Sequence, residues 1–500
     1  MPSQQYNALY ALYNATSGPG WKRNCNNWVF SPENTEAPCI RWYGVTCNNV
    51  CSVTSLQLQV CNLAGTIPTE IQYLTQIQYL YLYSNSLTGT IPAQIQNLTK
   101  MTQLSLSKNS LTGTIPTQIQ YLTQMQYLDL DTNNQTGTIP TQIQYLTQIQ
   151  YLYLYSNSLT GTIPTQIQYL TKVQYLNLDK NSLTGTIPTQ IQNLTHMVVL
   201  FIDSNSLTGT IPAQIQHLTK MTQLSLSKNS LTGTIPTQIQ YLKNMQVLFL
   251  DSNSLTGTIP TQIQYLKNMQ LLFLDSNSLT GTIPTQIQYL NSMKILYLFK
   301  NSLTGTIPTQ LLKCTSLQYL YLQSNNLHGS IPTTILTLTK LKGIDLSNNI
   351  QLSGTLDPLL NSNVSHTLSY LLLANMSLEG SLPDSLFGLP LLQTLVLSSN
   401  CITGTLPNSI CNSPQLNNLV LNGIQTNCKR KRSSYSSLGV IPSCIFSTPQ
   451  LQALYLVGNG LTGTIPMIPS NSTIQNISLA RNRLSGICIL HRYKICYFYI

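Results

Sequence analysis

The apolar residues of this chain follow a short repeating order, in which a strict alternation gives way to apolar residues spaced three or four positions apart. Leu80 and Leu82 alternate with tyrosines, and a period of two is typical of a strand with one buried face. Pro92 opposes a regular helix interior, so the return path is expected to be extended or short 3₁₀ structure. Ile95 and Leu98 then point back into the core. The pattern predicts a coil of chain that closes in 24 residues.

The same coil recurs along most of the chain. The tetrad Gly-Thr-Ile-Pro is repeated at steps of 24 residues, and its copies begin at Gly65, Gly89, Gly113, Gly137, Gly161, Gly185, Gly209, Gly233, Gly257, Gly281 and Gly305. A Gly-Ser-Ile-Pro copy begins at Gly329, and six looser copies follow between Gly354 and Gly486, which gives about eighteen turns. A unit of this size cannot bury its apolar face alone, so we expect successive turns to stack into a solenoid.

An asparagine occupies the next inward position after each predicted strand. The column consists of Asn85, Asn109, Asn133, Asn157, Asn181, Asn205, Asn229, Asn253, Asn277, Asn301 and Asn325. A buried polar side chain persists only where it is hydrogen-bonded. We therefore predict that these amides bridge the backbone groups of successive turns.

One unit reads L-x-x-L-x-L-x-x-N-x-L-x-G-x-I-P-x-x-I-x-x-L, which resembles the plant-type leucine-rich repeat over residues 52–486. Trp21, Trp28 and the segment CIRWYGVTC from Cys39 to Cys47 are similar to the amino-terminal cap of receptor-like protein ectodomains in that family. The resemblance implies an α/β solenoid, a right-handed coil of about eighteen 24-residue turns. It also implies a parallel sheet on the concave side, extended or 3₁₀ structure on the convex side, and a structural disulfide between the two cysteines.

The expected domain organisation follows from the limits of the repeats. Residues 1–51 form the cap, residues 52–486 the solenoid, and residues 487–500 a carboxy-terminal tail or incomplete cap. One step between glycines is lengthened to 35 residues, so an insertion is expected near 425–437. It contains the basic run 429–432, which indicates a solvated loop, or alternatively a processing site or an anionic contact.

Two turns depart from the pattern. Met376 takes the position of a column asparagine, and Gln135 takes the position of a core leucine. Other turns are copies of one another, since residues 98–120 and 218–240 are identical. Such copying argues against a unique catalytic residue in any single central turn.

Composition changes the expectation of what covers the solenoid. The chain is 42% hydrophobic and only 7% charged, whereas globular proteins average about a quarter charged residues. Uncharged Thr, Ser, Gln, Asn and Tyr must therefore form most of the surface. The net charge of +11 is thinly spread apart from the basic run, and no pattern of a nucleic-acid-binding module is present.

The sequence contains no pattern typical of catalysis or of cofactor binding. It has no G-x-S-x-G, no H-E-x-x-H, no phosphate-binding loop and no kinase signature. Only 13 residues are acidic, the five histidines are scattered, and no C-x-x-C occurs, which argues against a zinc site. We therefore expect a non-enzymatic protein without a cofactor and without a bound metal.

Two columns of side chains are expected on the outward face of the concave sheet, because residues two apart on a strand share a face. One column is aromatic and the other is acidic. The candidate ligand-binding residues are Tyr153, Phe201, Phe249, Phe273, Tyr297, Tyr321, Asp203, Asp251 and Asp275. Rings offer contact area at low entropy cost, and carboxylates accept hydrogen bonds from peptide amides, basic side chains or sugar hydroxyls. The face indicates recognition of a protein, peptide or glycan; alternatively, the stacked rings only stabilise the sheet.

A second hypothesis rests on the lateral side of the coil, where a Thr-Gly-Thr sequence such as Thr88-Gly89-Thr90 recurs. A flat rank of paired threonines with little charge resembles ice-binding solenoids, so an ice or polysaccharide surface is the alternative ligand. Leu-Thr-Gly-x-Ile-Pro is, however, ordinary for leucine-rich repeats. A cytosolic protein-interaction scaffold is a further alternative.

Cysteine usage bears on the cellular location. The twelve cysteines lie mostly near the two ends of the chain, a pattern typical of disulfides formed in an oxidising compartment. The sequons at Asn97 and Asn193 are candidate glycosylation sites. No apolar segment typical of a signal peptide is visible at the amino terminus, and no run of about 18 apolar residues occurs. We expect an extracellular or cell-surface protein with a membrane-associated co-receptor as a candidate partner; a cytoplasmic location is the alternative.

Overall fold

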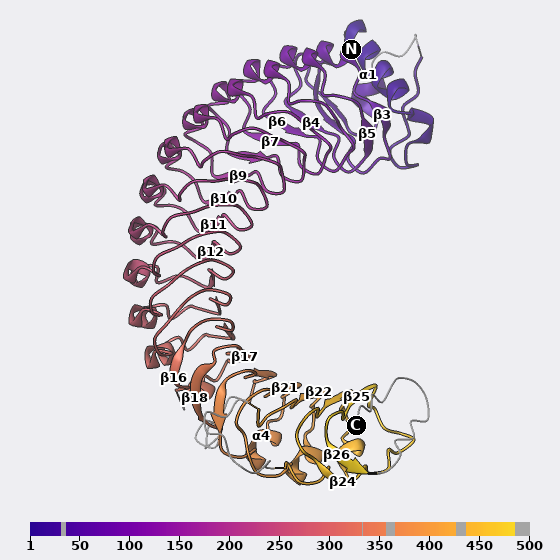
Figure 1. Ribbon diagram of the computed structural model, residues 1–500. Helices are drawn as coiled ribbons and strands as arrows, with labels where there is room; N and C mark the ends of the chain where they lie inside the picture. The colour runs from indigo at the N-terminus through magenta and orange to yellow at the C-terminus, as the bar shows by residue number, and fades with distance from the viewer. Residues whose placement is uncertain (32–36, 333, 357–365, 427–436, 486–500) are drawn as a thin grey trace. The chain divides into compact units, whose positions relative to one another are not determined.

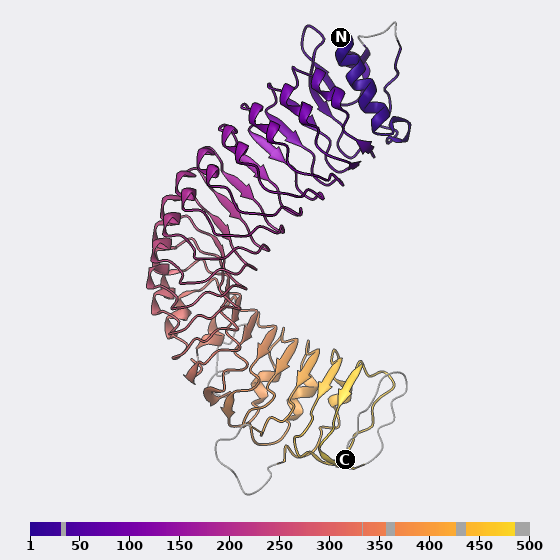
Figure 2. The same ribbon diagram turned by 45° about the horizontal axis from the view of Figure 1, so that its top comes forward.

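The computed structural model describes residues 1–31, 37–332, 334–356, 366–426 and 437–485. The chain forms two compact units, Met1–Ser254 and Leu255–Ile500. Each unit is a solenoid with a parallel sheet on one side and short 3₁₀ helices on the opposite side (Figures 1 and 2). The basic run, most of the predicted insertion and the predicted tail lie outside the described residues.

The amino-terminal unit begins with the cap. Its elements are helix α1 (Ser3–Ala15), the 3₁₀ turn η1 (Gly18–Gly20), helix α2 (Ala37–Arg41) and strand β1 (Val45–Cys47), which pairs antiparallel with β2 (Val53–Gln57). Beyond β2 the sheet is parallel, and its strands are β4 (Tyr79–Tyr81), β6 (Gln103–Ser105), β7 (Tyr127–Asp129), β8 (Tyr151–Tyr153), β9 (Tyr175–Asn177), β10 (Val199–Phe201), β11 (Gln223–Ser225) and β12 (Val247–Phe249). Partner residues are one turn apart, as Leu80 and Leu104 are.

The return path of each turn in this unit is a short 3₁₀ helix. These are η2 (Thr69–Tyr73), η3 (Ala93–Asn97), η4 (Thr117–Tyr121), η5 (Thr141–Tyr145), η6 (Thr165–Tyr169), η7 (Thr189–Asn193), η8 (Ala213–His217) and η9 (Thr237–Tyr241). A proline with extended ψ precedes each one; Pro92, for example, has φ −68° and ψ 141°. The lateral edge carries the short strands β3 (Ala64–Thr66) and β5 (Ser86–Thr88), followed by single threonine bridges.

The carboxy-terminal unit repeats this plan. Its parallel sheet consists of β13 (Leu271–Phe273), β14 (Ile295–Tyr297), β15 (Tyr319–Tyr321), β17 (Gly343–Asp345), β19 (Tyr370–Leu372), β21 (Thr394–Val396), β22 (Asn418–Val420), β23 (Ala453–Tyr455) and β25 (Asn476–Ser478). Its helices are η10 (Thr261–Tyr265), η11 (Thr285–Tyr289), η12 (Thr309–Lys313), η13 (Ile335–Thr337), α4 (Asp384–Phe387), η14 (Asn408–Asn412) and η15 (Ile445–Ser447). The lateral strands are β16 (His328–Ser330), β18 (Gln351–Thr355), β20 (Ser377–Glu379), β24 (Thr462–Thr464) and β26 (Arg483–Ser485).

The core consists of the residues that the alternating pattern places inward. Leu80, Leu82, Ile95 and Leu98 are each no more than 3% exposed, which confirms both the strand and the return path. Burying one such side chain stabilises the fold by about 1.5–3 kcal/mol. Five-residue 3₁₀ helices are not stable on their own, so packing between successive turns holds the coil together. In the described residues each unit contributes nine parallel strands, in agreement with the expected eighteen turns.

The asparagine column forms the predicted ladder. Asn85 donates through Nδ2 to the carbonyl oxygens of Leu58 (2.8 Å) and Leu82 (2.9 Å). Its Oδ1 accepts the backbone N–H of Leu63 at 3.0 Å. Equivalent bonds recur turn after turn, as far as Asn325 and beyond. Each amide therefore satisfies backbone groups of its own turn and of the preceding one.

The Thr-Gly-Thr sequence has a structural cause. Gly113 has φ +74°, a conformation that favours glycine. A Cβ at this position would lie 2.7 Å from Cγ2 of Thr90 in the preceding turn, so the threonine methyl group fills the space that the missing side chain leaves. Thr112 donates its hydroxyl to the carbonyl oxygen of Gly89 at 3.2 Å. Stacking of the turns alone is therefore enough to explain the recurrence of this tripeptide.

Two disulfides hold the amino-terminal cap. The expected Cys39–Cys47 bond is present, and Cys25 pairs with Cys61. The indole rings of Trp21, Trp28 and Trp42 are buried, and those of Trp28 and Trp42 are stacked with centroids 4.9 Å apart. The carboxy-terminal unit contains a Cys411–Cys444 disulfide.

Both departures from the repeat pattern are buried. Met376 and Gln135 are each 0% exposed. The side-chain amide of Gln135 has no hydrogen-bond partner for either its oxygen or its nitrogen. The leucines at the equivalent position of the neighbouring turns, Leu111 and Leu159, are also 0% exposed. Gln135 therefore places an unsatisfied polar group in an otherwise apolar layer.

Candidate ligand-binding face

The predicted aromatic column lies at the ends of the sheet strands. Each ring belongs to the last residue of its strand, and each is half-buried. In the amino-terminal unit these residues are Tyr153 on β8, Phe201 on β10 and Phe249 on β12; in the carboxy-terminal unit they are Phe273 on β13, Tyr297 on β14 and Tyr321 on β15.

The rings of the carboxy-terminal unit stack on one another. The centroids of Phe273 and Tyr297 are 4.5 Å apart, and those of Tyr297 and Tyr321 are 4.7 Å apart with an interplanar angle of 1°. Burial, reinforced by the neighbouring tyrosines, raises the pKa of Tyr321 to about 12. The ring faces cover one another and contribute to pairing of the strands. What remains exposed belongs to a continuous aromatic surface within this unit.

The predicted acidic column is only partly available to a ligand. Asp203 donates its backbone N–H to Oδ1 of Asp179 at 2.8 Å. Burial, together with a hydrogen bond and charge repulsion from Asp203, raises the pKa of Asp179 to about 8. Asp251 accepts a hydrogen bond from Ser227, and Asp275 is 6% exposed. The carboxylates of Asp179 and Asp251 therefore accept hydrogen bonds from neighbouring turns, and that of Asp275 is buried.

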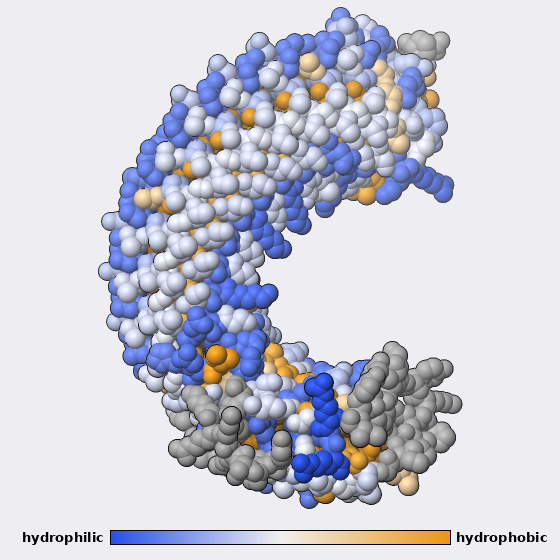
Figure 3. Space-filling model, viewed as in Figure 1, coloured by the Kyte–Doolittle hydropathy of each residue, from blue (hydrophilic) through white to orange (hydrophobic). Residues whose placement is uncertain are grey.

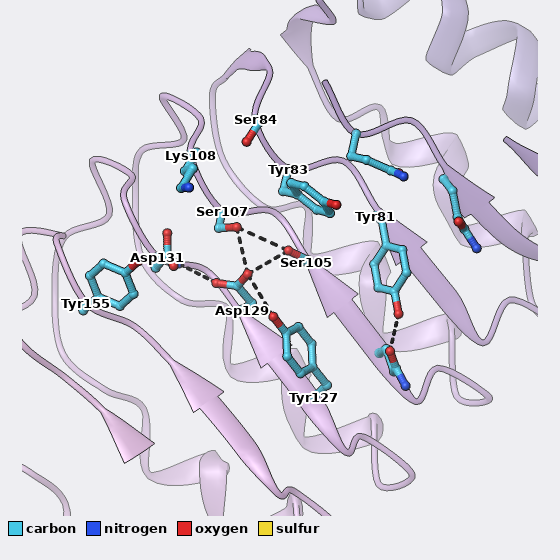
Figure 4. Close-up of a pocket in the computed structure, with 13 residues that line it drawn as sticks. Tyr81, Tyr83, Ser84, Ser105, Ser107, Lys108, Tyr127, Asp129, Asp131 and Tyr155 are labelled. Carbon is cyan, nitrogen blue, oxygen red and sulfur yellow. Dashed lines mark hydrogen bonds between the residues drawn. The ribbon is translucent and has the colours of Figure 1, made fainter. Parts of the chain in front are cut away.

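A pocket of about 610 Å³ lies on the sheet face of the amino-terminal unit (Figure 4). Its size is in the range of ligand sites. It is formed by residues on β2, β4, β6 and β7 and by residues just after β2, β4, β6, β7 and β8. Its lining includes Tyr81, Ser105, Ser107, Lys108, Tyr127, Asp129, Asp131 and Tyr155.

Asp129 lies at the centre of the pocket and is well supplied with donors. Its Oδ2 accepts hydrogen bonds from the hydroxyls of Ser105 and Ser107, both at 2.8 Å, and of Tyr127 at 3.3 Å. Its Oδ1 accepts the backbone N–H of Asp131 at 3.2 Å. Figure 4 shows these donors converging on one carboxylate. The carboxylate is therefore held in one orientation.

Asp131 is less well satisfied. It is 7% exposed, and its Oδ1 has no hydrogen-bond partner. Burial and then the negative charge of Asp129 raise the pKa of Asp131, although hydrogen bonds from Tyr155 and Thr132 oppose the rise. Burial, followed by its bond to Asp131, raises the pKa of Tyr155 to about 12, so this hydroxyl stays protonated as a donor.

The sequence contained a signal for this pocket. Asp131 occupies the same position of its turn as Asp203, six residues before the glycine, but Asp129 occupies a position of the aromatic column, where Tyr153 is the next member. An aspartate in an aromatic column, followed two positions later by a second aspartate, places two carboxylates on one strand face. The exception in the aromatic column, rather than its regular members, is therefore the sequence signal for this pocket.

The threonine ranks lie on the lateral edge and are exposed. Many of their hydroxyls are engaged within the protein, as that of Thr112 is. On the face shown in Figure 3, the described surface is mostly pale or blue, with orange confined to small patches. This face therefore carries no large apolar patch.

The described residues hold no group of three or more His, Cys, Asp or Glu side chains arranged to bind a metal ion. Among the helices in the same described ranges, none combines the length and the apolar character needed to cross a membrane. The candidate glycosylation sites Asn97 and Asn193 are exposed at the ends of η3 and η7.

Comparison with known families identifies both the repeats and the cap. A family model described as leucine rich repeat matches residues 75–135, 123–183, 171–231, 220–279, 243–303 and 267–327. A model described as leucine rich repeat N-terminal domain matches residues 2–48, and a further leucine rich repeat model matches residues 391–413.

One curated relative is a probable leucine-rich repeat receptor-like protein kinase of Arabidopsis thaliana. It is 38% identical over 81 residues, which are 16% of this chain and 8% of that protein. The chain thus matches less than a tenth of the length of this relative.

Several solved structures are similar over most of the chain. The plant peptide hormone receptor RGFR1 in complex with RGF2 is 31% identical, with a TM-score of 0.74, and the match covers 85% of this chain and 70% of that one. The PEPR1–AtPEP1 structure is 27% identical, with a TM-score of 0.69 and coverage of 96% and 79%. The Arabidopsis receptor kinase HAESA, in complex with the peptide hormone IDA and the co-receptor SERK1, is 26% identical, with a TM-score of 0.68 and coverage of 97% and 94%.

Proposed function

Because the chain belongs to the leucine-rich repeat family, we propose that it is a non-enzymatic recognition module that binds a peptide or protein ligand on the sheet face. The observation that carries the proposal is a sheet face that combines an aromatic surface with a pocket of about 610 Å³. Such a face offers both contact area and fixed hydrogen-bond acceptors. A glycan ligand is the alternative on the same face.

The similar structures support a peptide ligand. RGFR1 is a plant peptide hormone receptor and was solved in complex with RGF2, and HAESA was solved with the peptide hormone IDA and a co-receptor. By analogy, a peptide ligand and a membrane-associated co-receptor are the partners that we propose for this chain. The Cys39–Cys47 and Cys25–Cys61 disulfides support an extracellular or cell-surface location, because such bonds persist in oxidising compartments.

The test is capture of synthetic peptides by the full chain, measured by biolayer interferometry. The informative variant replaces Tyr297 and Tyr321 by Ala on the sheet face. The matched control replaces Tyr265 and Tyr289 by Ala, since these half-exposed tyrosines lie on the 3₁₀ helices of the same unit. We expect the first pair to weaken binding by about tenfold or more and the second pair to change it less than about twofold.

The stacked rings also support the strands, so folding has to be followed separately. Hydrogen exchange of β14 and β15 provides that measurement. Unchanged peptide affinity in a folded variant of Tyr297 and Tyr321 would refute binding at the aromatic surface. Equal losses in the two pairs would show that the sheet face has no special role.

A further inference from the structure

The pocket of the amino-terminal unit contains two buried carboxylates without a counter-ion. Asp129 and Asp131 are 6% and 7% exposed. No ion pair joins either of them to a lysine or arginine within the described ranges. The basic residue at the pocket, Lys108, is exposed, and its backbone N–H donates to the backbone carbonyl oxygen of Asp131 at 3.0 Å, not to the carboxylate. Within the described ranges the protein therefore supplies no ion-pair partner for these two carboxyl groups.

The two carboxylates differ in how much binding capacity they retain. Asp129 accepts four hydrogen bonds and is saturated. Asp131 has an unpartnered, buried Oδ1 in the same pocket. A buried acceptor without a donor is costly, and a buried charge is costlier still. Donors that carry a positive charge would remove both costs, so the pocket favours a ligand with N–H groups on a cation.

The walls of the pocket favour an organic cation over a metal ion. Tyr81, Tyr127 and Tyr155 line it, and aromatic rings attract guanidinium and ammonium groups. Calcium takes six to eight oxygen ligands, whereas Asp129 already uses its lone pairs on internal donors. The volume of about 610 Å³ accommodates a side chain together with part of its peptide backbone. A planar guanidinium group suits this site, because its N–H groups can donate to the unpartnered Oδ1 of Asp131 while its charge lies near the carboxylate of Asp129.

We propose that this pocket binds the guanidinium group of an arginine side chain of the ligand, with Asp131 as the direct partner and Asp129 as the second charge. The proposal deepens the proposed function and rests on it for the identity of the ligand as a peptide or protein. Ser105, Ser107 and Tyr127 then act as positioning residues, since they hold the Asp129 carboxylate in place.

The chain contains an internal control for this site. Residues 98–120 and 218–240 are identical, so Ser225 and Ser227 correspond to Ser105 and Ser107. The turn that follows the second copy has Phe249 and Asp251 where the first has Asp129 and Asp131. The second site therefore retains one carboxylate and lacks the other. Asp129→Phe recreates that arrangement with a residue that the fold already accepts.

The experiment uses the full chain and two small probes, N-acetyl-arginine amide and N-acetyl-citrulline amide. Citrulline has nearly the same shape as arginine but no charge. Binding is followed at pH 7.5 by saturation-transfer NMR. We expect the arginine probe to bind at least about tenfold more tightly than the citrulline probe. Asp131→Asn and Asp129→Phe should each abolish that difference, whereas Asp251→Asn should preserve it.

Several results would overturn the proposal. Equal binding of the two probes would exclude recognition of charge. An unchanged preference in folded Asp131→Asn protein would place the cation elsewhere. Calcium that binds the wild type, requires Asp131 and displaces no arginine probe would identify a metal site.

The two proposals fail in different ways. If the arginine probe does not bind but the Tyr297 and Tyr321 variant still loses peptide capture, the pocket proposal is wrong and the recognition function stands. If the arginine probe binds through Asp131 but sheet-face variants do not affect peptide capture, the pocket binds a guanidinium group and the proposed function is wrong.

Discussion

Gln135→Leu should stabilise the amino-terminal unit. Gln135 is 0% exposed, and neither polar atom of its side chain has a hydrogen-bond partner. Its backbone N–H is separately bonded to Oδ1 of Asn157 at 3.0 Å, so the substitution leaves the ladder intact. Leucine fills the same position in the adjacent turns as Leu111 and Leu159, both 0% exposed. The new side chain therefore enters a layer that already holds leucines at this position.

The magnitude follows from the two unsatisfied groups. A buried donor or acceptor without a partner costs about 1–3 kcal/mol, so the side chain of Gln135 costs about 2–6 kcal/mol. The surrounding turns relax in part around the amide, and the lower half of that range is the better expectation. An increase of about 3 kcal/mol in the free energy of local opening corresponds to roughly a hundredfold slower amide exchange.

Hydrogen exchange with mass spectrometry is the suitable assay, because a repeat protein can open locally without unfolding as a whole. The informative amides are Asn134 N–H, bonded to the carbonyl of Leu111, and Ser158 N–H, bonded to the carbonyl of Gln135, each at 2.8 Å. The matched control is Leu183→Gln, which should accelerate exchange in its own turn by a similar factor. Exchange that is unchanged or faster in Gln135→Leu would refute the assignment of the amide as an unsatisfied core group.

Two further predictions concern the carboxyl pair and the sequons. The pKa of Asp179 is raised to about 8 from its ordinary value of 3.8, so the folded state binds this proton more tightly than the unfolded state. The resulting contribution to the free energy of unfolding is fully present below about pH 4 and is lost as the pH rises to 8. Asp179→Asn should flatten that dependence in hydrogen exchange corrected for intrinsic rates, with Asp203 and Lys180 left in place; an unaltered pH profile would contradict it. Asn97 and Asn193 are exposed and should carry glycans after secretion from a eukaryotic host, because both sequons are accessible; intact mass should fall by one glycan for each Asn→Gln variant, and an unmodified mass in the wild type would contradict it.

The fold was predictable because every turn repeats the same physical solution. Leu80, Ile95 and Asn85 each have a counterpart in almost every turn, so a single interpretation is tested many times within one sequence. Alternation predicts the strand, the proline predicts the non-helical return path, and the buried amide requires partners in the backbone. The structure confirms all three in both units.

The pairing of the outward side chains was less predictable. A column read along the sequence shows which residues share a face but not which ones use up the hydrogen-bonding capacity of others. Asp203 and Asp251 look like free acceptors in the sequence, yet each belongs to a pair with Asp179 or Ser227. Aromatic residues show the same limitation, because Tyr297 stacks on both neighbours and offers less free ring surface than its column position implies.

Identical turns acquire different sites because a site on a solenoid is shared between neighbours. The side chains of Ser105 and Ser107 point at Asp129, whereas in the identical copy the hydroxyl of Ser227 bonds Asp251. The following turns differ at this point, because Asp129 in the first is replaced by Phe249 in the second. Copying a turn therefore preserves the core and the ladder, which depend on the turn itself and on any neighbour of the same type. It does not preserve the outward chemistry, which depends on the particular pair of turns that meet.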